Sequence, residues 1–161
     1  MKGILIYDSV FGNTEKAAQA VKSILSVADT VSIVRVSEIQ VPQLAEFQLV
    51  VVGSPTRGFR PTEAIAQFLK SIPAGFLAGK MAAAFDTRIA VDDISPAILR
   101  FIVKSGGYAA PSIARRLEQC GARLLAEPEG FFVKGSEGPL KDGESDRAAL
   151  WAKAIAAAAQ R

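Results

Sequence analysis

Short runs of apolar residues alternate along this chain with stretches in which apolar residues recur every three or four positions. A continuous apolar run predicts a strand that is buried on both faces, and the helical spacing predicts an amphipathic helix that packs on a sheet. The predicted strands are residues 2–7, 30–36, 49–52, 81–85 and parts of 123–133, the last interrupted near Pro128.

The predicted helices fall between these strands. Their inner faces carry Ala17, Ala18, Val21, Ile24 and Leu25; then Ile65, Phe68, Leu69 and Ile72; then Ile113, Leu117 and Cys120; and finally Trp151, Ile155 and Ala158. Alternating strands and helices predict a doubly wound α/β domain, with a five-stranded parallel sheet and helices on both faces. We expect residues 1–161 to form this single domain.

The loops after the first, third and fourth predicted strands should open on the same edge of such a sheet, where ligands bind in doubly wound folds. Residues 87–110 are the least regular part of the chain and predict a short helix between two loops. The apolar residues of this segment, Ile98, Leu99, Phe101, Ile102 and Val103, either cover the core or form a lid or a dimer contact.

Composition excludes several classes of function. The chain of 161 residues has no histidine, which removes Ser-His-Asp and Cys-His catalysis and histidine ligation of metals. Its 19 basic and 16 acidic residues give a formal net charge of +3, but the basic residues are scattered, so binding to nucleic acid is not indicated.

A single cysteine, Cys120, predicts a buried packing thiol. With no apolar run of membrane-spanning length, we expect a soluble, cytoplasmic protein, monomeric or homodimeric.

The loop after the first strand is the main candidate site. It reads Ser9-Val10-Phe11-Gly12-Asn13-Thr14, with a helix expected to begin near its end. Small and hydroxyl residues let backbone N–H groups converge there, and the positive end of the helix dipole adds to them, so the loop predicts an anion-binding seat. It matches neither the GxxxxGK[ST] loop nor the GxGxxG loop. The alternative interpretation is a plain turn, in which glycine, asparagine and threonine serve only for turning and capping.

The same six residues resemble the phosphate loop of flavodoxins, S/T-x-T-G-x-T. The resemblance implies FMN as the cofactor, a sheet of order 2-1-3-4-5, and a phosphate bound by Ser9, Gly12, Asn13 and Thr14. Phe11 departs from the family pattern, which has threonine there, so one hydroxyl contact would be missing.

Two further loops support the resemblance. Gly53-Ser54-Pro55-Thr56-Arg57-Gly58 is similar to the G-[ST]-P-T loop that borders the flavin ring in flavodoxin-like proteins, including NAD(P)H:quinone oxidoreductases. Asp86-Thr87-Arg88, after the fourth predicted strand, resembles another segment of a flavodoxin-like family. The resemblance implies that Pro55, Thr56, Arg57 and Gly58 contact the isoalloxazine, and we expect Asp86, Thr87 and Arg88 to belong to the cofactor site as well. No aromatic residue follows Phe85 until Phe101, so Phe59 or Tyr108 would replace the stacking tyrosine of many flavodoxins.

Three arginines, Arg57, Arg60 and Arg88, are expected at the ligand edge. Cations there would raise the reduction potential of a bound flavin above that of acidic flavodoxins. The resemblance implies a redox protein that carries electrons between a reductase and an acceptor protein. The alternatives are an FMN-dependent NAD(P)H:quinone-type oxidoreductase and a flavodoxin-fold interaction module without a cofactor.

Overall fold

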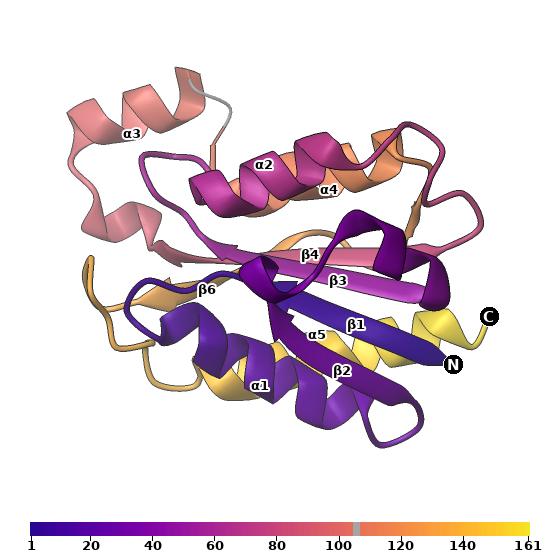
Figure 1. Cartoon of the computed structure of the whole chain (residues 1–161). Helices are drawn as coiled ribbons and strands as arrows, with labels where there is room; N and C mark the ends of the chain where they lie inside the picture. The colour runs from indigo at the N-terminus through magenta and orange to yellow at the C-terminus, as the bar shows by residue number, and fades with distance from the viewer. Residues whose placement is uncertain (105–106) are drawn as a thin grey trace.

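A computed structural model describes residues 1–104 and 107–161, and the side chains of all of these except residues 91 and 101–104. Figure 1 shows a parallel sheet between layers of helices. The strands are β1 (Lys2–Tyr7), β2 (Thr30–Arg35), β3 (Leu49–Pro55), β4 (Met81–Ile89), β5 (Arg123–Leu124) and β6 (Glu129–Val133). The helices are α1 (Asn13–Leu25), α2 (Glu63–Ser71), α3 (Pro96–Lys104), α4 (Ala109–Gln119) and α5 (Glu144–Ala159), with short 3-10 segments η1 (Val36–Glu38), η2 (Val41–Glu46) and η3 (Val91–Asp93).

The strand order confirms the predicted topology. The strands run β2-β1-β3-β4-β5, and β6 also pairs with β4 in parallel. β5 pairs with the start of β4, and β6 pairs with Phe85 to Ile89 at its end, so the two short strands share the fifth position of the sheet. The predicted interruption near Pro128 is therefore real, as expected for a residue without a backbone N–H.

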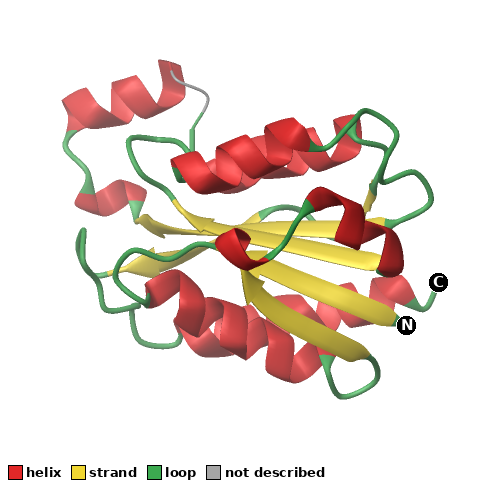
Figure 2. Ribbon diagram, in the orientation of Figure 1, coloured by secondary structure: helices red, strands yellow, loops and turns green. Residues whose placement is uncertain are grey.

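Helices cover both faces of the sheet, as Figures 1 and 2 show: α1 and α5 lie on one face, and α2 and α4 on the other. The core under α1 and α5 contains three large aromatic residues, Phe85, Phe131 and Trp151, whose ring centroids lie 5.8–6.0 Å apart. Gly53 makes room for one of them, because a Cβ atom there would overlap the Phe85 ring. The opposite core includes Cys120, which is buried as predicted.

Strands β3 and β4 are longer than predicted. β3 continues through Ser54 and Pro55, and β4 continues through Asp86, Thr87 and Arg88, which the sequence analysis placed in a loop. The reason is that Asp86 and Thr87 have ladder partners in both β3 and β6, and Arg88 has a partner in β6. The residues assigned to two loops therefore belong largely to strand ends, which have a defined side-chain direction.

The outward-facing backbone groups of β6 also have partners. The Phe132 N–H donates to Glu144 Oε2 at 2.7 Å, and the Lys141 N–H donates to the Phe132 carbonyl at 2.8 Å. The Lys134 N–H donates to the Pro139 carbonyl at 2.8 Å, and the Arg147 guanidinium donates to the Gly130 carbonyl. The returning chain and two α5 side chains thus close this side of the sheet.

The predicted short helix in the irregular segment is α3, which lies beyond the carboxyl ends of the strands in Figure 1. Ile98, on this helix, is 47% exposed. The side chains of Phe101, Ile102 and Val103, which belong to the predicted apolar segment, lie outside the described residues. Among the described residues, no helix is long and apolar enough to cross a membrane.

Candidate functional site

A cavity of about 330 Å³ opens at the carboxyl ends of β1, β3 and β4, where the sequence analysis placed the ligand edge. Its volume falls in the range of small-molecule sites, about 300–1,000 Å³. The cavity is lined by Ser9, Val10, Phe11, Asn13, Thr14, Pro55, Thr56, Arg57, Gly58, Thr87, Arg88, Ile89, Val133 and Ser136. Residues from separate strand ends therefore meet in one hollow.

The start of α1 faces this cavity without a side-chain cap. Gly12 is the N-cap residue, with φ of 89°, a left-handed conformation that glycine adopts without strain. The first N–H groups of a helix have no partner within the helix, and the N-cap residue Gly12 has no side chain to cap them. At α2, by contrast, the Thr62 hydroxyl accepts from the Ile65 N–H. The α1 end therefore offers backbone donors and a positive dipole end to an anion.

The polar side chains of the first loop are already held in place by the protein. Ser9 Oγ accepts from the Gly12 N–H at 3.0 Å, and the Thr14 and Thr87 hydroxyl oxygens lie 2.8 Å apart in a buried hydrogen bond. The Asn13 amide donates to the Glu137 carbonyl at 3.0 Å. Each hydroxyl retains further hydrogen-bonding capacity. The Asn13 side chain also joins α1 to the chain after β6, a role that the sequence analysis did not foresee.

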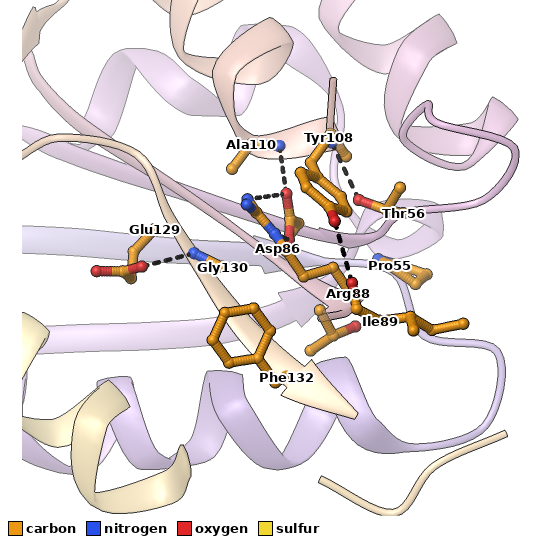
Figure 3. Close-up of polar contacts among 12 residues, drawn as sticks. Pro55, Thr56, Asp86, Arg88, Ile89, Tyr108, Ala110, Glu129, Gly130 and Phe132 are labelled. Carbon is orange, nitrogen blue, oxygen red and sulfur yellow. Dashed lines mark hydrogen bonds and ion pairs between the residues drawn. The ribbon is translucent and has the colours of Figure 1, made fainter. Parts of the chain in front are cut away.

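Below the cavity, the end of β4 carries a buried ion pair (Figure 3). Asp86 is fully buried, and its two oxygens accept from Arg88 Nε at 2.6 Å and Arg88 Nη2 at 2.7 Å. The same carboxylate accepts from the Ala110 N–H at 2.8 Å, and so caps the start of α4. Burial raises the pKa of Asp86, while Arg88, the Ala110 N–H and the Thr56 hydroxyl oppose that rise. Asp86 therefore holds Arg88 and the start of α4 in position, and it does not line the cavity.

The Arg88 side chain is held on other sides too (Figure 3). Its guanidinium carbon lies 4.0 Å from the centroid of the Tyr108 ring, a cation–π contact. A Cβ atom at Gly130 would overlap the guanidinium, so this glycine makes room for it. The Tyr108 hydroxyl donates to the Ile89 carbonyl at 3.1 Å, which joins the two ends of the segment that contains α3.

The three arginines expected at this edge differ in environment. Arg57 and Arg60 end a tight hairpin, in which their backbone groups exchange hydrogen bonds of 2.7 and 3.1 Å. Arg57 is exposed, lines the cavity and lies over the Phe11 ring at 5.5 Å. Arg60 does not line the cavity, and Arg88 is neutralised by Asp86. Two described arginines line the cavity, and Arg88 is paired with Asp86. Arg57 is the one of the two that has no carboxylate partner.

Most of the predicted site residues line this cavity, and four do not. Gly12 contributes its backbone turn, while Ser54 is buried and its hydroxyl accepts from the Thr62 N–H at 2.9 Å. Asp86 lies beneath Arg88, and Phe59 lines a neighbouring cavity instead. The sequence analysis missed three lining residues, Ile89, Val133 and Ser136. The position of Val133 at the end of an apolar run was the one available signal, because strand ends meet at this edge.

Comparisons with known proteins agree with this geometry. Curated proteins give no match. Among solved structures, a flavodoxin from the domain Archaea is similar over 100% of both chains, with 20% identity and a TM-score of 0.75. Oxidised flavodoxin 2 from Bacillus cereus shares 20% identity over 98% of this chain and 99% of its own, with a TM-score of 0.73. Two-electron reduced Megasphaera elsdenii flavodoxin shares 21% identity over 99% of both chains, with a TM-score of 0.69.

These likenesses concern the fold. At the level of sequence, the model of the flavodoxin domain family matches residues 4–104, which include the first loop and the ends of β3 and β4. Since this match spans more than half of the chain, the protein belongs to the flavodoxin family, whose cofactor is FMN.

Proposed function

We propose that this protein binds FMN non-covalently in the cavity at the strand ends and carries electrons between a reductase and an acceptor protein. The observation that carries the proposal is the uncapped start of α1, which opens on the cavity where the ends of β1, β3 and β4 converge. Membership of the flavodoxin family supports the same assignment.

The phosphate of FMN fits the first loop chemically. The backbone donors that begin α1 suit a dianion, and the hydroxyls of Ser9 and Thr14 can donate to its oxygens. Thr14 is held by Thr87, so its hydroxyl would be positioned before the ligand arrives. Phe11 brings no hydroxyl and is 47% exposed at the rim. The side chain of Asn13 is occupied by the Glu137 carbonyl, so we assign its contribution to the backbone.

The flavin ring would lie against the residues of the second and third segments, Pro55, Thr56, Arg57, Gly58, Thr87 and Arg88. FMN supplies the redox chemistry when bound, and the protein supplies binding, orientation and electrostatics. The positive charge of Arg57 stabilises added negative charge nearby, which favours reduction. Arg88 contributes less, because its charge is paired with Asp86.

A titration with FMN and riboflavin tests the proposal. The two ligands share the ring and differ in the phosphate, so the difference between their affinities isolates the first loop. Hydrogen bonds to charged groups contribute about 1.5–3 kcal/mol each, so we expect FMN to bind at least about 100-fold more tightly. Equal affinities would mean that the phosphate lies elsewhere. Failure of both ligands to saturate the protein would favour an interaction module without a cofactor.

A second candidate function is an FMN-dependent NAD(P)H:quinone-type oxidoreductase. The observation that favours it is the exposed Arg57 at the cavity mouth, with the exposed Arg60 beside it, since such cations attract the phosphates of a nicotinamide nucleotide. Bleaching of the flavin absorbance by NADPH, without added reductase, would support this enzyme. Bleaching only after a reductase is added would support the electron carrier.

A cytoplasmic location is also part of our proposal, because the single cysteine is free and buried.

A further inference from the structure

Arg35, the last residue of β2, lies beside the first loop of the candidate site. In the sheet register it is the partner of Tyr7, the last residue of β1, so it lies next to the point where the chain enters that loop. Arg35 Nη1 donates to the Ser9 carbonyl at 3.2 Å, and the guanidinium carbon lies 5.3 Å from the centroid of the Tyr7 ring. An arginine of the edge strand, which does not line the cavity, therefore holds the backbone of a loop that does.

Two carboxylates flank the first loop. Asp8 precedes it, and Asp8 Oδ1 accepts from the Ser9 N–H at 2.9 Å. Glu15 lies in the first turn of α1, and its Oε1 atom accepts from the Tyr7 hydroxyl at 2.9 Å. A carboxylate at this end of a helix interacts favourably with the helix dipole, so it weakens the attraction that the same end exerts on a bound anion. The predicted phosphate seat thus has a negative charge on each flank.

Arg35 is paired with both of these carboxylates. Its Nη1 atom lies 3.7 Å from Asp8 Oδ1, and its Nη2 atom lies 3.7 Å from Glu15 Oε2. In the part of the chain that the structure describes, neither carboxylate has an ion pair with another cation. One guanidinium therefore bridges the two flanks, offsets part of their negative charge and donates to the loop between them.

We propose that Arg35 is a positioning residue of the phosphate seat, which ties the two flanks of the first loop together and offsets their carboxylates so that the seat accepts a dianion. This inference rests on the proposed binding of FMN. The side chains of Arg35 and Glu15 are 40% and 42% exposed, and exposed ion pairs contribute little to folding. Loss of the Arg35 charge should therefore weaken the binding of a phosphate much more than it lowers the melting temperature.

Titrations of Arg35→Gln with FMN and riboflavin test this proposal. The variant should bind FMN about ten-fold more weakly than wild type at low salt, and riboflavin, which lacks the phosphate, equally well. The difference in FMN affinity should shrink at high salt, because salt screens the repulsion between the phosphate and the exposed carboxylates. Arg35→Lys keeps the charge and should restore most of the FMN affinity.

Arg123→Gln is the matched control for net charge. Arg123 is an exposed residue of β5 that pairs with Met81 at the start of β4, so it lies at the opposite ends of the strands from the cavity. This variant loses the same charge as Arg35→Gln and should bind FMN as the wild type does.

The double variant Glu15→Gln/Arg35→Gln distinguishes this role from a merely structural one. It removes one of the repelling carboxylates, while the glutamine at position 15 can still accept from the Tyr7 hydroxyl. It should therefore bind FMN more tightly than Arg35→Gln alone. If Arg35 served only to hold the fold, the loss of a second polar contact would weaken binding further.

Three results would overturn the proposal: unchanged FMN affinity of Arg35→Gln, equal losses of affinity for FMN and riboflavin, or a double variant that binds FMN no more tightly than the single one. In each case the wild type still binds FMN, so the proposed function stands. Failure of the wild type to bind FMN would refute the proposed function, and the assignment of Arg35 with it.

Discussion

Replacing Arg88 with methionine should strongly destabilise the fold, because it removes the charged partner of a buried carboxylate. Asp86 is 0% exposed and the Arg88 side chain is 16% exposed, so solvent cannot replace the two hydrogen bonds of 2.6 and 2.7 Å. Methionine keeps an unbranched apolar stem beside Tyr108. Breaking a buried ion pair from one side costs about 3–5 kcal/mol.

Two remaining hydrogen-bond donors to the Asp86 carboxylate reduce the loss of stability in Arg88→Met. The Ala110 N–H still donates to the Asp86 carboxylate at 2.8 Å, and the Thr56 hydroxyl remains a partner. The carboxylate is therefore not left without hydrogen bonds, and we expect the free energy of unfolding at pH 7 to fall by about 3 kcal/mol, the lower end of that range. This is a large share of the stability of a typical domain, about 5–15 kcal/mol.

The loss should depend on pH. Burial raises the pKa of Asp86, and Arg88 is the strongest opposing influence, so the variant should have a still higher folded-state pKa. A folded-state pKa above the unfolded value means that the folded protein binds more protons. The contribution of the protonated Asp86 to the stability of the variant is then fully present below the unfolded pKa, near 3.8. This contribution is lost as the pH rises through the folded-state pKa. Arg88→Met should therefore lie closer to wild type at pH 4 than at pH 7.

Urea unfolding, followed by circular dichroism at both pH values, measures these effects. The double variant Asp86→Asn/Arg88→Met removes both charges and should be more stable than Arg88→Met alone at pH 7. A loss below about 1 kcal/mol for Arg88→Met at pH 7 would refute the reasoning, since that is the size of an exposed pair. So would a double variant no more stable than the single one.

Three further predictions concern other residues. Thr14→Ala should weaken FMN by about 1–2 kcal/mol and leave riboflavin unchanged in equilibrium titrations, and an unchanged FMN affinity would place the phosphate elsewhere. Arg57→Gln should lower the reduction potential of bound flavin, more at low salt than at high salt, and a redox titration without a shift would contradict this. Burial raises the pKa of Glu144, but Arg147 and the Phe132 N–H outweigh it and hold the pKa below 4.5. The stabilisation from the Glu144 carboxylate should therefore be present above pH 4.5 and lost as the pH falls further. In acid unfolding, the stability of Glu144→Gln should fall less over this pH range than the stability of the wild type.

The existence of the strands could be predicted because each contains a run of apolar or β-branched residues, and their order was implied by the resemblance to flavodoxins. Their ends could not, because glycine, serine, proline and aspartate at the ends of β3 and β4 are turn residues in local terms. What keeps Asp86 and Arg88 in a strand is pairing with β6, more than forty residues later. One signal was present: opposite charges two residues apart lie on the same face of a strand and can pair.

In the candidate site, too, the local features could be predicted from the sequence and the features that depend on distant strands could not. The backbone of the first loop is a local property of Gly12 and the helix that follows, so its turn was predictable. The contact of Asn13 with the Glu137 carbonyl and the presence of Val133 in the cavity depend on where β6 ends in the sheet. Likewise, the place of Phe59 in the wall of the neighbouring cavity follows from a tight turn that pairs Arg57 with Arg60.

The hydrogen bonds along the outer side of β6 have a consequence for the behaviour of the protein in concentrated solution. An edge strand with free N–H and C=O groups is a template for pairing with another chain, which leads to aggregation. Here the Glu144 carboxylate, the Arg147 guanidinium and the returning residues Pro139 and Lys141 occupy those groups. This edge is therefore protected against strand addition by the start of α5 and the chain that leads into it, and variants that loosen the start of α5 should aggregate before they lose the rest of the fold.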